Sequence, residues 1–310
     1  MKTNLHRYLA LLLCALTTLI TTPLSANPLQ MINVADNVYA LIGPMEQRSP
    51  DNLANNANFG FIVSDQGVLL IDSGGTLAGA KDIERQIRTI TDKPITLVIN
   101  TGGQDHRWFG NSYFAALGAD TLTSVQTQAD QTARGDNQSD STSRLTGDSW
   151  NGTDPQPAQQ TISANKSLTF GDTQIQIIPV GPAHTGGETL VWLPQHKLLF
   201  SGDTVYLDRM LGIGGQSQHL NWLAAFATID ALNPTTIIPG HGMPADLAKA
   251  QKETRDYLTL LRTEVSKLIE DGADMEDATN IDQSAYSYLK VYDSLHKRNA
   301  LRVYEEMEWE

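Results

Sequence analysis

The order of the predicted elements is typical of a mixed α/β protein in which two sheets lie between helical layers. Short apolar, β-branched segments alternate with segments of helical periodicity, and Gly, Pro, Asp or Asn separates most of them. Both halves of the chain are rich in such strand segments, with a few helices between them, which favours two sheets. A single doubly wound sheet shows similar alternation, so the pattern alone leaves that architecture open.

Strands are predicted at nine apolar runs: residues 38–42, 58–63, 68–71, 95–99, 168–170, 175–180, 189–193, 197–200 and 235–238. Helices are predicted where apolar residues recur at helical spacing: residues 77–91, 107–117, 220–232 and 245–270. Residues 27–245 are expected to form the main domain, and the amphipathic residues 246–310 to form helices packed on it. A dimer surface is the alternative for these C-terminal helices.

Residues 127–160 stand apart because they consist mostly of Gln, Asp, Ser, Thr, Gly and Asn. A segment with so few apolar side chains cannot bury a core of its own. We therefore expect a long polar insertion on the surface, which could act as a mobile flap.

The first 26 residues are typical of a secretory signal peptide. Lys2 and Arg7 precede an uncharged apolar run over residues 8–20, and the small residues Ser25 and Ala26 follow. The run is shorter than the roughly 20 apolar residues that a membrane span needs. We expect cleavage after Ala26 and a periplasmic or secreted protein without a membrane association.

Charge and cysteine content limit the possible partners and metal ligands. The net charge is −13, and removal of Lys2 and Arg7 would bring it to −15. This acidity argues against nucleic acid and anionic membranes as partners and leaves a small-molecule substrate. The one cysteine, Cys14, lies in the predicted signal peptide, so a metal site in the mature chain must use His, Asp, Glu or water.

Several polar residues follow directly after predicted strands. Asp72 ends the strand of VLLIDSGG, and Asp105 and His106 lie in the Gly-rich INTGGQDHRWFGN. Taken singly, such residues are often turn formers or helix caps.

Three further strand ends carry metal-ligand residue types. His184 lies in GPAHTGG, Asp203 in FSGDT and His241 in IIPGHG. Imidazoles combined with a carboxylate are a common zinc set, so three independent strand ends of this kind favour a metal site.

In this order and spacing, the motifs resemble those of the metallo-β-lactamase-fold hydrolases over residues 34–244. The NALRVYEEME end resembles an exported branch linked to sulfur oxidation and quinoprotein oxidation. The resemblance implies an αββα sandwich with a metal site at one sheet edge. It also implies zinc-activated water attacking an ester, thioester, lactam or phosphoester. Nothing in the sequence marks a β-lactam pocket.

The family's T-H-x-H-x-D-H motif is degraded in this chain. Thr101 and the frame at Gly110 match without a gap, which places Gly102 and Gln104 at the first two histidine positions. His106 then stands at the aspartate position and Arg107 at the last histidine. In a shifted register, Asp105 and His106 would instead be the Asp-His pair.

The resemblance leaves His106, His184, Asp203 and His241 as ligands for one zinc ion. Asp105 is expected to act as a general base, with an ion pair to Arg107 or a helix cap as the alternative. Asp72 is expected to hold a ligand histidine by its second ring nitrogen. The resulting hypothesis is a single-metal periplasmic hydrolase; a non-catalytic binding or accessory protein that reuses the fold is the alternative.

Overall fold

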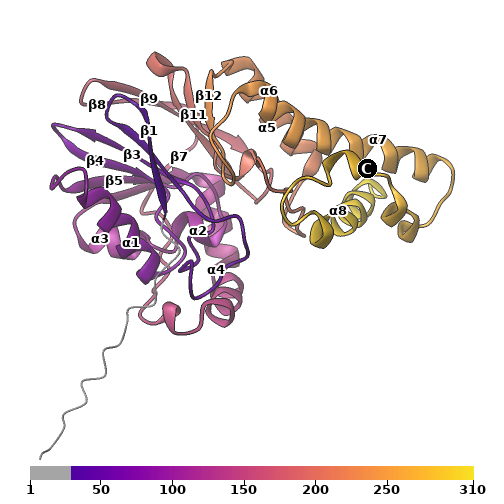
Figure 1. Ribbon diagram of the computed structural model, residues 1–310, viewed down its shortest axis with the longest axis horizontal. Helices are drawn as coiled ribbons and strands as arrows, with labels where there is room; N and C mark the ends of the chain where they lie inside the picture. The colour runs from indigo at the N-terminus through magenta and orange to yellow at the C-terminus, as the bar shows by residue number, and fades with distance from the viewer. Residues whose placement is uncertain (1–28) are drawn as a thin grey trace, which may run out of the picture.

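The computed structural model describes residues 29–310, so the predicted signal peptide lies outside the described part. Within residues 29–310, no helix is both long and apolar enough to cross a membrane. The predicted two-sheet architecture is confirmed. Figure 1 shows two sheets packed on each other, helices on their outer sides, and the C-terminal helices extending away at one end.

The first sheet has seven strands in chain order, of which β1–β4 pair antiparallel and β4–β7 parallel. They are β1 (Gln30–Ala35), β2 (Val38–Ile42), β3 (Phe59–Ser64), β4 (Gly67–Ile71), β5 (Ile95–Ile99), β6 (Asp120–Ser124) and β7 (Gln160–Ile162). The second sheet has the order β12-β11-β10-β9-β8, and only β11 and β12 pair in parallel. They are β8 (Lys166–Phe170), β9 (Thr173–Gly181), β10 (Glu188–Leu193), β11 (Leu198–Phe200) and β12 (Thr236–Ile238).

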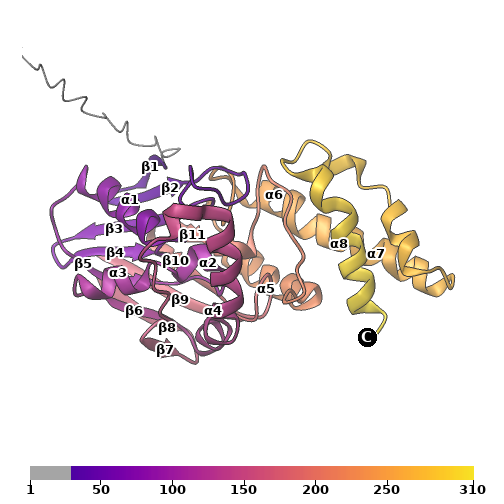
Figure 2. The same cartoon turned by 90° about the horizontal axis from the view of Figure 1, so that it is seen from below.

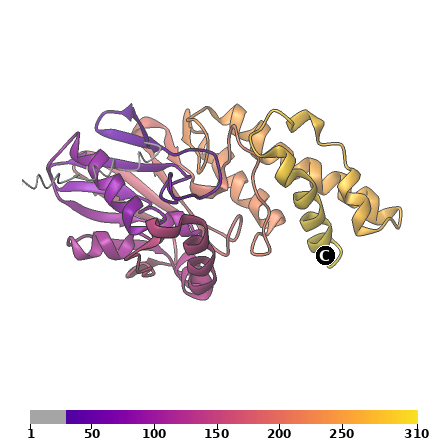
Figure 3. The same ribbon diagram turned by 60° about the horizontal axis from the view of Figure 1, so that its bottom comes forward.

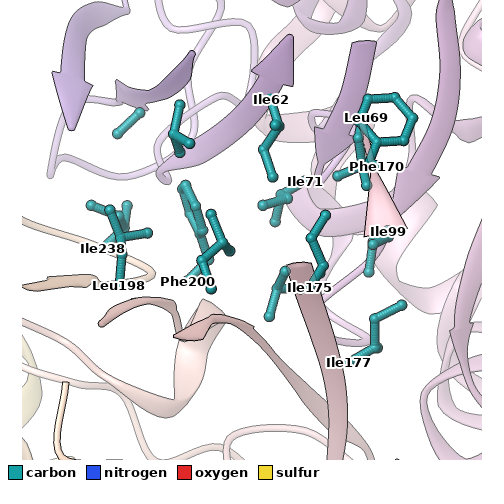
Figure 4. Packing of buried hydrophobic residues seen from close by; sticks show 14 of the residues in the cluster. Ile62, Leu69, Ile71, Ile99, Phe170, Ile175, Ile177, Leu198, Phe200 and Ile238 are labelled. Atoms are coloured by element: carbon teal, nitrogen blue, oxygen red, sulfur yellow. The ribbon is translucent and has the colours of Figure 1, made fainter. Parts of the chain in front are cut away.

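The main core lies between the two sheets. Successive side chains of a strand point to opposite faces, so Leu69 and Ile71 of β4 share the inner face. They belong to the same buried cluster as Ile175 and Ile177 of β9 and Phe200 of β11, which Figure 4 shows from close by. This cluster holds the sheets together and fixes where their strands end.

Helices cover both outer faces. On the first sheet, Phe61 and Leu70 pack with Ile83 of α1 (Leu77–Arg88). On the second, Trp192 and Leu199 pack with α5 (His219–Leu232) and α6 (Leu247–Ala250). Figure 2 shows α1 and α3 beside β3, β4 and β5 of the first sheet. The layers are therefore helix, sheet, sheet and helix, as the resemblance implied.

The predicted helix over residues 107–117 is two short helices, α2 (Asp105–Trp108) and α3 (Asn111–Ala116). Between them the backbone at Gly110 comes so close to the Ser73 carbonyl that a Cβ on Gly110 would overlap it. The chain can make this contact only by breaking the helix. Strands β1, β6 and β7 were not predicted, and the last two contain only one strongly apolar residue each.

Residues 127–160, expected as a long polar insertion on the surface, begin with regular structure that the sequence analysis did not predict. Residues Val125–Thr146 form a regular helix, α4, which continues into a short 3-10 helix (Gly147–Trp150). Gln138 and Thr142 of α4 are buried although the helix has no apolar face. Gln138 donates to the Gly103 carbonyl at 2.9 Å, and Thr142 donates to Asp105 at 2.5 Å. Polar side chains pack here because they satisfy the polar groups of the neighbouring loop.

The C-terminal helices pack at one end of the sandwich, as Figure 3 shows. Helix α6 runs through a π-helical turn (Gln251–Arg255) into α7 (Asp256–Glu270), and α8 (Tyr292–Met307) packs against α7. Both helices share a buried cluster with Trp222 of α5 and with Met210 and Leu211 of the loop after β11. Asn299 of α8 anchors that loop by donating to the Leu211 carbonyl at 2.8 Å.

Candidate metal centre

Three strand ends deliver candidate ligands to one point. His106 follows β5, Asp203 follows β11 and His241 follows β12, and all three side chains are buried. Nε2 of His106 lies 3.1 Å from Asp203 Oδ2, and Nε2 of His241 lies 3.2 Å from Asp203 Oδ1. One ligand atom from each residue lies within 4.8 Å of the others, so the three can hold a metal ion.

His184 does not join this group, although the sequence placed it among the ligands. Its Nδ1 lies 3.1 Å from the Gly212 carbonyl oxygen, and its Nε2 lies 3.3 Å from the Tyr206 hydroxyl. A carbonyl oxygen only accepts, so Nδ1 carries the proton and Nε2 accepts from Tyr206. The Tyr206 ring stacks on His241 with 4.7 Å between centroids and therefore lies between the two histidines.

Arg107 is buried next to Asp203 and holds its carboxylate in place. Its fully buried guanidinium donates to both oxygens of Asp203, at 2.7 and 3.2 Å, and to Asp72 at 2.9 Å. It also donates to the carbonyls of Asn58 and Gly240. Asp72 accepts from Arg107 and Thr101 and is hydrogen-bonded to no histidine within residues 29–310, so the prediction that it holds a ligand histidine is wrong.

Charges around Asp203 determine the ionisation of the centre. Burial alone would raise the pKa of Asp203, but the Arg107 guanidinium and the His106 ring hold it well below its usual range. Burial lowers the pKa of His106 and that of His184 to about 4. At neutral pH the centre therefore consists of an ionised carboxylate beside neutral imidazoles, the protonation states that bind metals.

Asp105 pairs with Arg48, not with Arg107. Arg48 Nε donates to Asp105 Oδ2 at 2.5 Å, and a second guanidinium nitrogen contacts Oδ1. Burial raises the pKa of Asp105, but Arg48 and His106 outweigh it and hold the pKa well below its usual range. A carboxylate with such a low pKa is a weak proton acceptor. His106 is in the ligand group and Asp105 is not, which favours the ungapped register.

The donor set fits a single ion. Four ligands at zinc's usual distances lie roughly 3.3 Å apart in a tetrahedron, close to the separations at Asp203. His241 Nδ1 is buried without a hydrogen-bond partner among the described residues, so no donor prevents it from carrying the ring proton when Nε2 binds the metal. Arg48 opposes metal binding at His106. Its Nη2 lies 3.0 Å from His106 Nδ1, and because a guanidinium only donates, this Nδ1 is the acceptor and the ring proton is on Nε2. For Nε2 to bind a metal, the proton must move to Nδ1, where Asp105 Oδ1 lies 3.6 Å away.

Other side chains fill the positions of the missing histidines. A Cβ on Gly102 would overlap Glu188 Oε2, which is buried and without a partner among residues 29–310. Burial and the Asp203 charge raise the pKa of Glu188 well above its usual range. Gln104 donates to Asp105 at 3.1 Å. Sequence reasoning missed Arg48, Tyr206 and Glu188, because no motif marks them and only the fold brings them to the centre.

Comparisons with known proteins agree with this architecture. The chain is 27% identical over 190 residues to the metallo-beta-lactamase type 2 of Elizabethkingia meningoseptica, covering 60% of this chain and 68% of that protein. It is 24% identical over 183 residues to the 2,4-dinitroanisole O-demethylase subunit alpha of Nocardioides sp. (strain JS1661), covering 58% of this chain and 51% of that subunit. The chain thus spans about half the length of the second relative.

Solved structures share the fold at low identity. A metallo-beta-lactamase from Pontibacter korlensis superposes with a TM-score of 0.60 at 18% identity, covering 74% of this chain and 99% of the other. The mono-zinc form of FIM-1 from Pseudomonas aeruginosa superposes with a TM-score of 0.57 at 17% identity, covering 74% and 95%. The family model of the metallo-beta-lactamase superfamily matches residues 54–241, from the loop before β3 to His241. The chain belongs to the metallo-beta-lactamase superfamily.

Proposed function

We propose that this protein is a metal-dependent hydrolase that uses one zinc ion, held by His106, Asp203 and His241. The observation that carries the proposal is the convergence of these three buried side chains from separate strand ends, with ligand atoms within 4.8 Å of one another. Three protein ligands leave a fourth position open, as in catalytic zinc sites. Bound zinc would acidify water and polarise the bond to be cleaved in an ester, a thioester or a related substrate.

The chain's own residues supply positioning around such an ion. Arg107 holds both oxygens of Asp203 and so fixes the carboxylate between the two imidazoles. His184 lines the pocket, and its proton-free Nε2 accepts from Tyr206. Because burial lowers the pKa of His184 to about 4, we assign it to positioning the Tyr206 hydroxyl and not to general-base catalysis. Asp105 was the sequence candidate for that role; we assign it instead to holding Arg48 and orienting His106.

Metal content of the purified chain tests the proposal directly. Chelator-treated protein is loaded with Zn²⁺ at neutral pH, desalted and analysed. We expect about one equivalent per chain, and less than about a tenth of an equivalent would refute the site. His106→Ala and His241→Ala should each weaken zinc binding more than roughly tenfold. Tenfold is about the smallest loss expected when a residue that only hydrogen-bonds to a ligand is removed, and these two residues are ligands themselves. His196→Ala, at the partly exposed turn after β10, is the matched control and should bind like the wild type.

Turnover of ester and thioester substrates tests the hydrolase part separately. We expect activity that follows the zinc content and falls with His184→Ala at unchanged zinc content. Full zinc occupancy without turnover of any of these substrates would favour the second candidate, a non-catalytic binding protein. Two observations support that candidate: Arg48 contacts His106, and Glu188 fills the space beside Gly102.

We further propose that the protein acts in the periplasm or is secreted. The basic, apolar and small-residue stretches of residues 1–26 support this. Fractionation of cells that produce the full chain, followed by N-terminal sequencing, tests it. A mature chain beginning at Asn27 is expected, whereas an intact N-terminus in the cytoplasmic fraction would contradict the proposal.

A further inference from the structure

The pocket in front of the candidate metal centre is basic, although the chain carries a net charge of −13. Its cavity has a volume of about 200 Å³, and three arginines line it: Arg48, Arg209 and Arg298. His106, His184 and His241 form its floor, and none of its lining residues within the described part of the chain carries a carboxylate. Arg48 is paired with Asp105, so the surplus positive charge comes from Arg209 and Arg298, and fixed charge of this kind attracts an anion.

Arg209 is the member of this set without an internal partner. Its side chain makes no hydrogen bond or ion pair within residues 29–310, and its Nε is buried. The carboxylates whose charges act on it are Asp203 and Glu46, and neither is hydrogen-bonded to it. Asp203 is already occupied by Arg107 and the two histidines. Arg209 is partly exposed, but a buried donor such as its Nε normally has a partner, so this unpartnered nitrogen indicates a ligand that supplies one.

Arg298 comes from the C-terminal part of the chain. It lies on α8, is exposed to solvent and has no ion-pair partner among the described residues. The Asn299 side chain beside it accepts from Ile213 N at 2.9 Å, which anchors α8 to the loop that forms the pocket wall. Arg298 therefore lines the pocket from a fixed helix and is exposed, whereas Arg209 is only partly exposed.

We propose that this pocket binds a compact organic molecule through a negatively charged oxyanion group, held by Arg209 and Arg298. Guanidinium groups match carboxylate, sulfonate and phosphate oxygens with paired hydrogen bonds. Ile213 and Leu295 provide apolar lining for the rest of the molecule. The cavity is smaller than the roughly 300–1,000 Å³ typical of sites for drug-sized ligands, which favours a small compound. Binding of the anion does not depend on the proposed hydrolase function. The identification of the anion as the substrate rests on that function.

Binding of matched small probes to the chelator-treated full chain tests the proposal without metal or turnover. Benzoate, benzenesulfonate and phenyl phosphate share a ring and differ in the oxyanion, and benzamide is the neutral counterpart. At constant ionic strength, calorimetric titration should detect at least one of the anions, with benzamide binding at least about tenfold more weakly, since charge-assisted bonds are lost. The anion that binds most tightly identifies the oxyanion class.

Variants assign the binding to the two arginines. Arg209→Gln and Arg298→Gln should each weaken the anion about tenfold or more, whereas Lys297→Gln, which removes the same charge from α8 outside the pocket, should stay within about twofold. If Arg209→Gln does not fold, the exposed Arg298 still provides the test. Equal binding by Arg298→Gln and the wild type, equal binding of benzamide and the anions, or no anion binding at millimolar concentration would each overturn the proposal. The assay uses metal-free protein, so none of these outcomes bears on zinc binding, and the metal site is tested separately by the zinc content.

Discussion

Replacement of Arg107 by Met should destabilise the protein by about 4 kcal/mol. The guanidinium is fully buried, and it donates to Asp72, to both oxygens of Asp203 and to two backbone carbonyls. Methionine has a similar length but no donor. Removal of one partner from a buried ion pair costs roughly 3–5 kcal/mol, because it leaves a buried charge without compensation. Here two carboxylates lose the same cation, and burial already opposes ionisation of Asp72, raising its pKa to about 6.

Urea denaturation followed by tryptophan fluorescence measures the effect, with thermal unfolding as a second readout. A loss of about 4 kcal/mol should lower the Tm by roughly 10 °C in a chain of this size. Lys267→Met is the control, because Lys267 pairs with Glu264 on the surface of α7 and is 60% exposed. Such a pair contributes roughly 0–1 kcal/mol, so the control should unfold like the wild type.

A second substitution separates the charge effect from loss of packing. In the double variant Arg107→Met with Asp72→Asn, one of the two uncompensated carboxylates is neutral, so we expect about 1–2 kcal/mol to be regained relative to Arg107→Met alone. A loss of less than about 1 kcal/mol for Arg107→Met, in a protein with native circular dichroism, would refute the reasoning. So would an Asp72→Asn substitution that only adds to the loss.

Two further predictions concern parts of the chain around the centre. Gly242 has φ +94°, and a Cβ there would overlap the Leu207 carbonyl, so Gly242→Ala should cost about 2–3 kcal/mol in urea denaturation; a cost below about 0.5 kcal/mol would contradict this. His219 is buried, and burial with the adjacent Arg262 lowers its pKa to about 4. Between pH 6.5 and 4, the unfolded chain binds a proton that folded His219 does not, so stability falls as the pH falls, by on the order of 3 kcal/mol from this residue. His219→Gln should reduce the pH dependence in this window by that amount, and an unchanged dependence of unfolding free energy on pH would disprove the assignment.

Sequence by itself determined the fold class and most of the strands. The inner strand β4 is apolar throughout, and β10 is apolar from Leu190 to Leu193, because both faces of their sheets are covered. Such apolar runs are recognisable from the local sequence alone. The candidate ligands His106, Asp203 and His241 were also named from the sequence, because each follows a predicted strand and falls within the motif order that resembles the family's.

Only the tertiary structure decided which polar groups meet. Helix α4 has no apolar stripe, so its packing depends on the hydrogen bonds of Gln138 to Gly103 and of Thr142 to Asp105, the first residue of α2. Arg48 and Arg209 reach the pocket from segments far apart in the chain, where no local pattern marks them. Hydrophobic periodicity is a local property of a chain, whereas pairing of buried charges depends on contacts between distant segments, and the chemistry of this centre depends on such contacts.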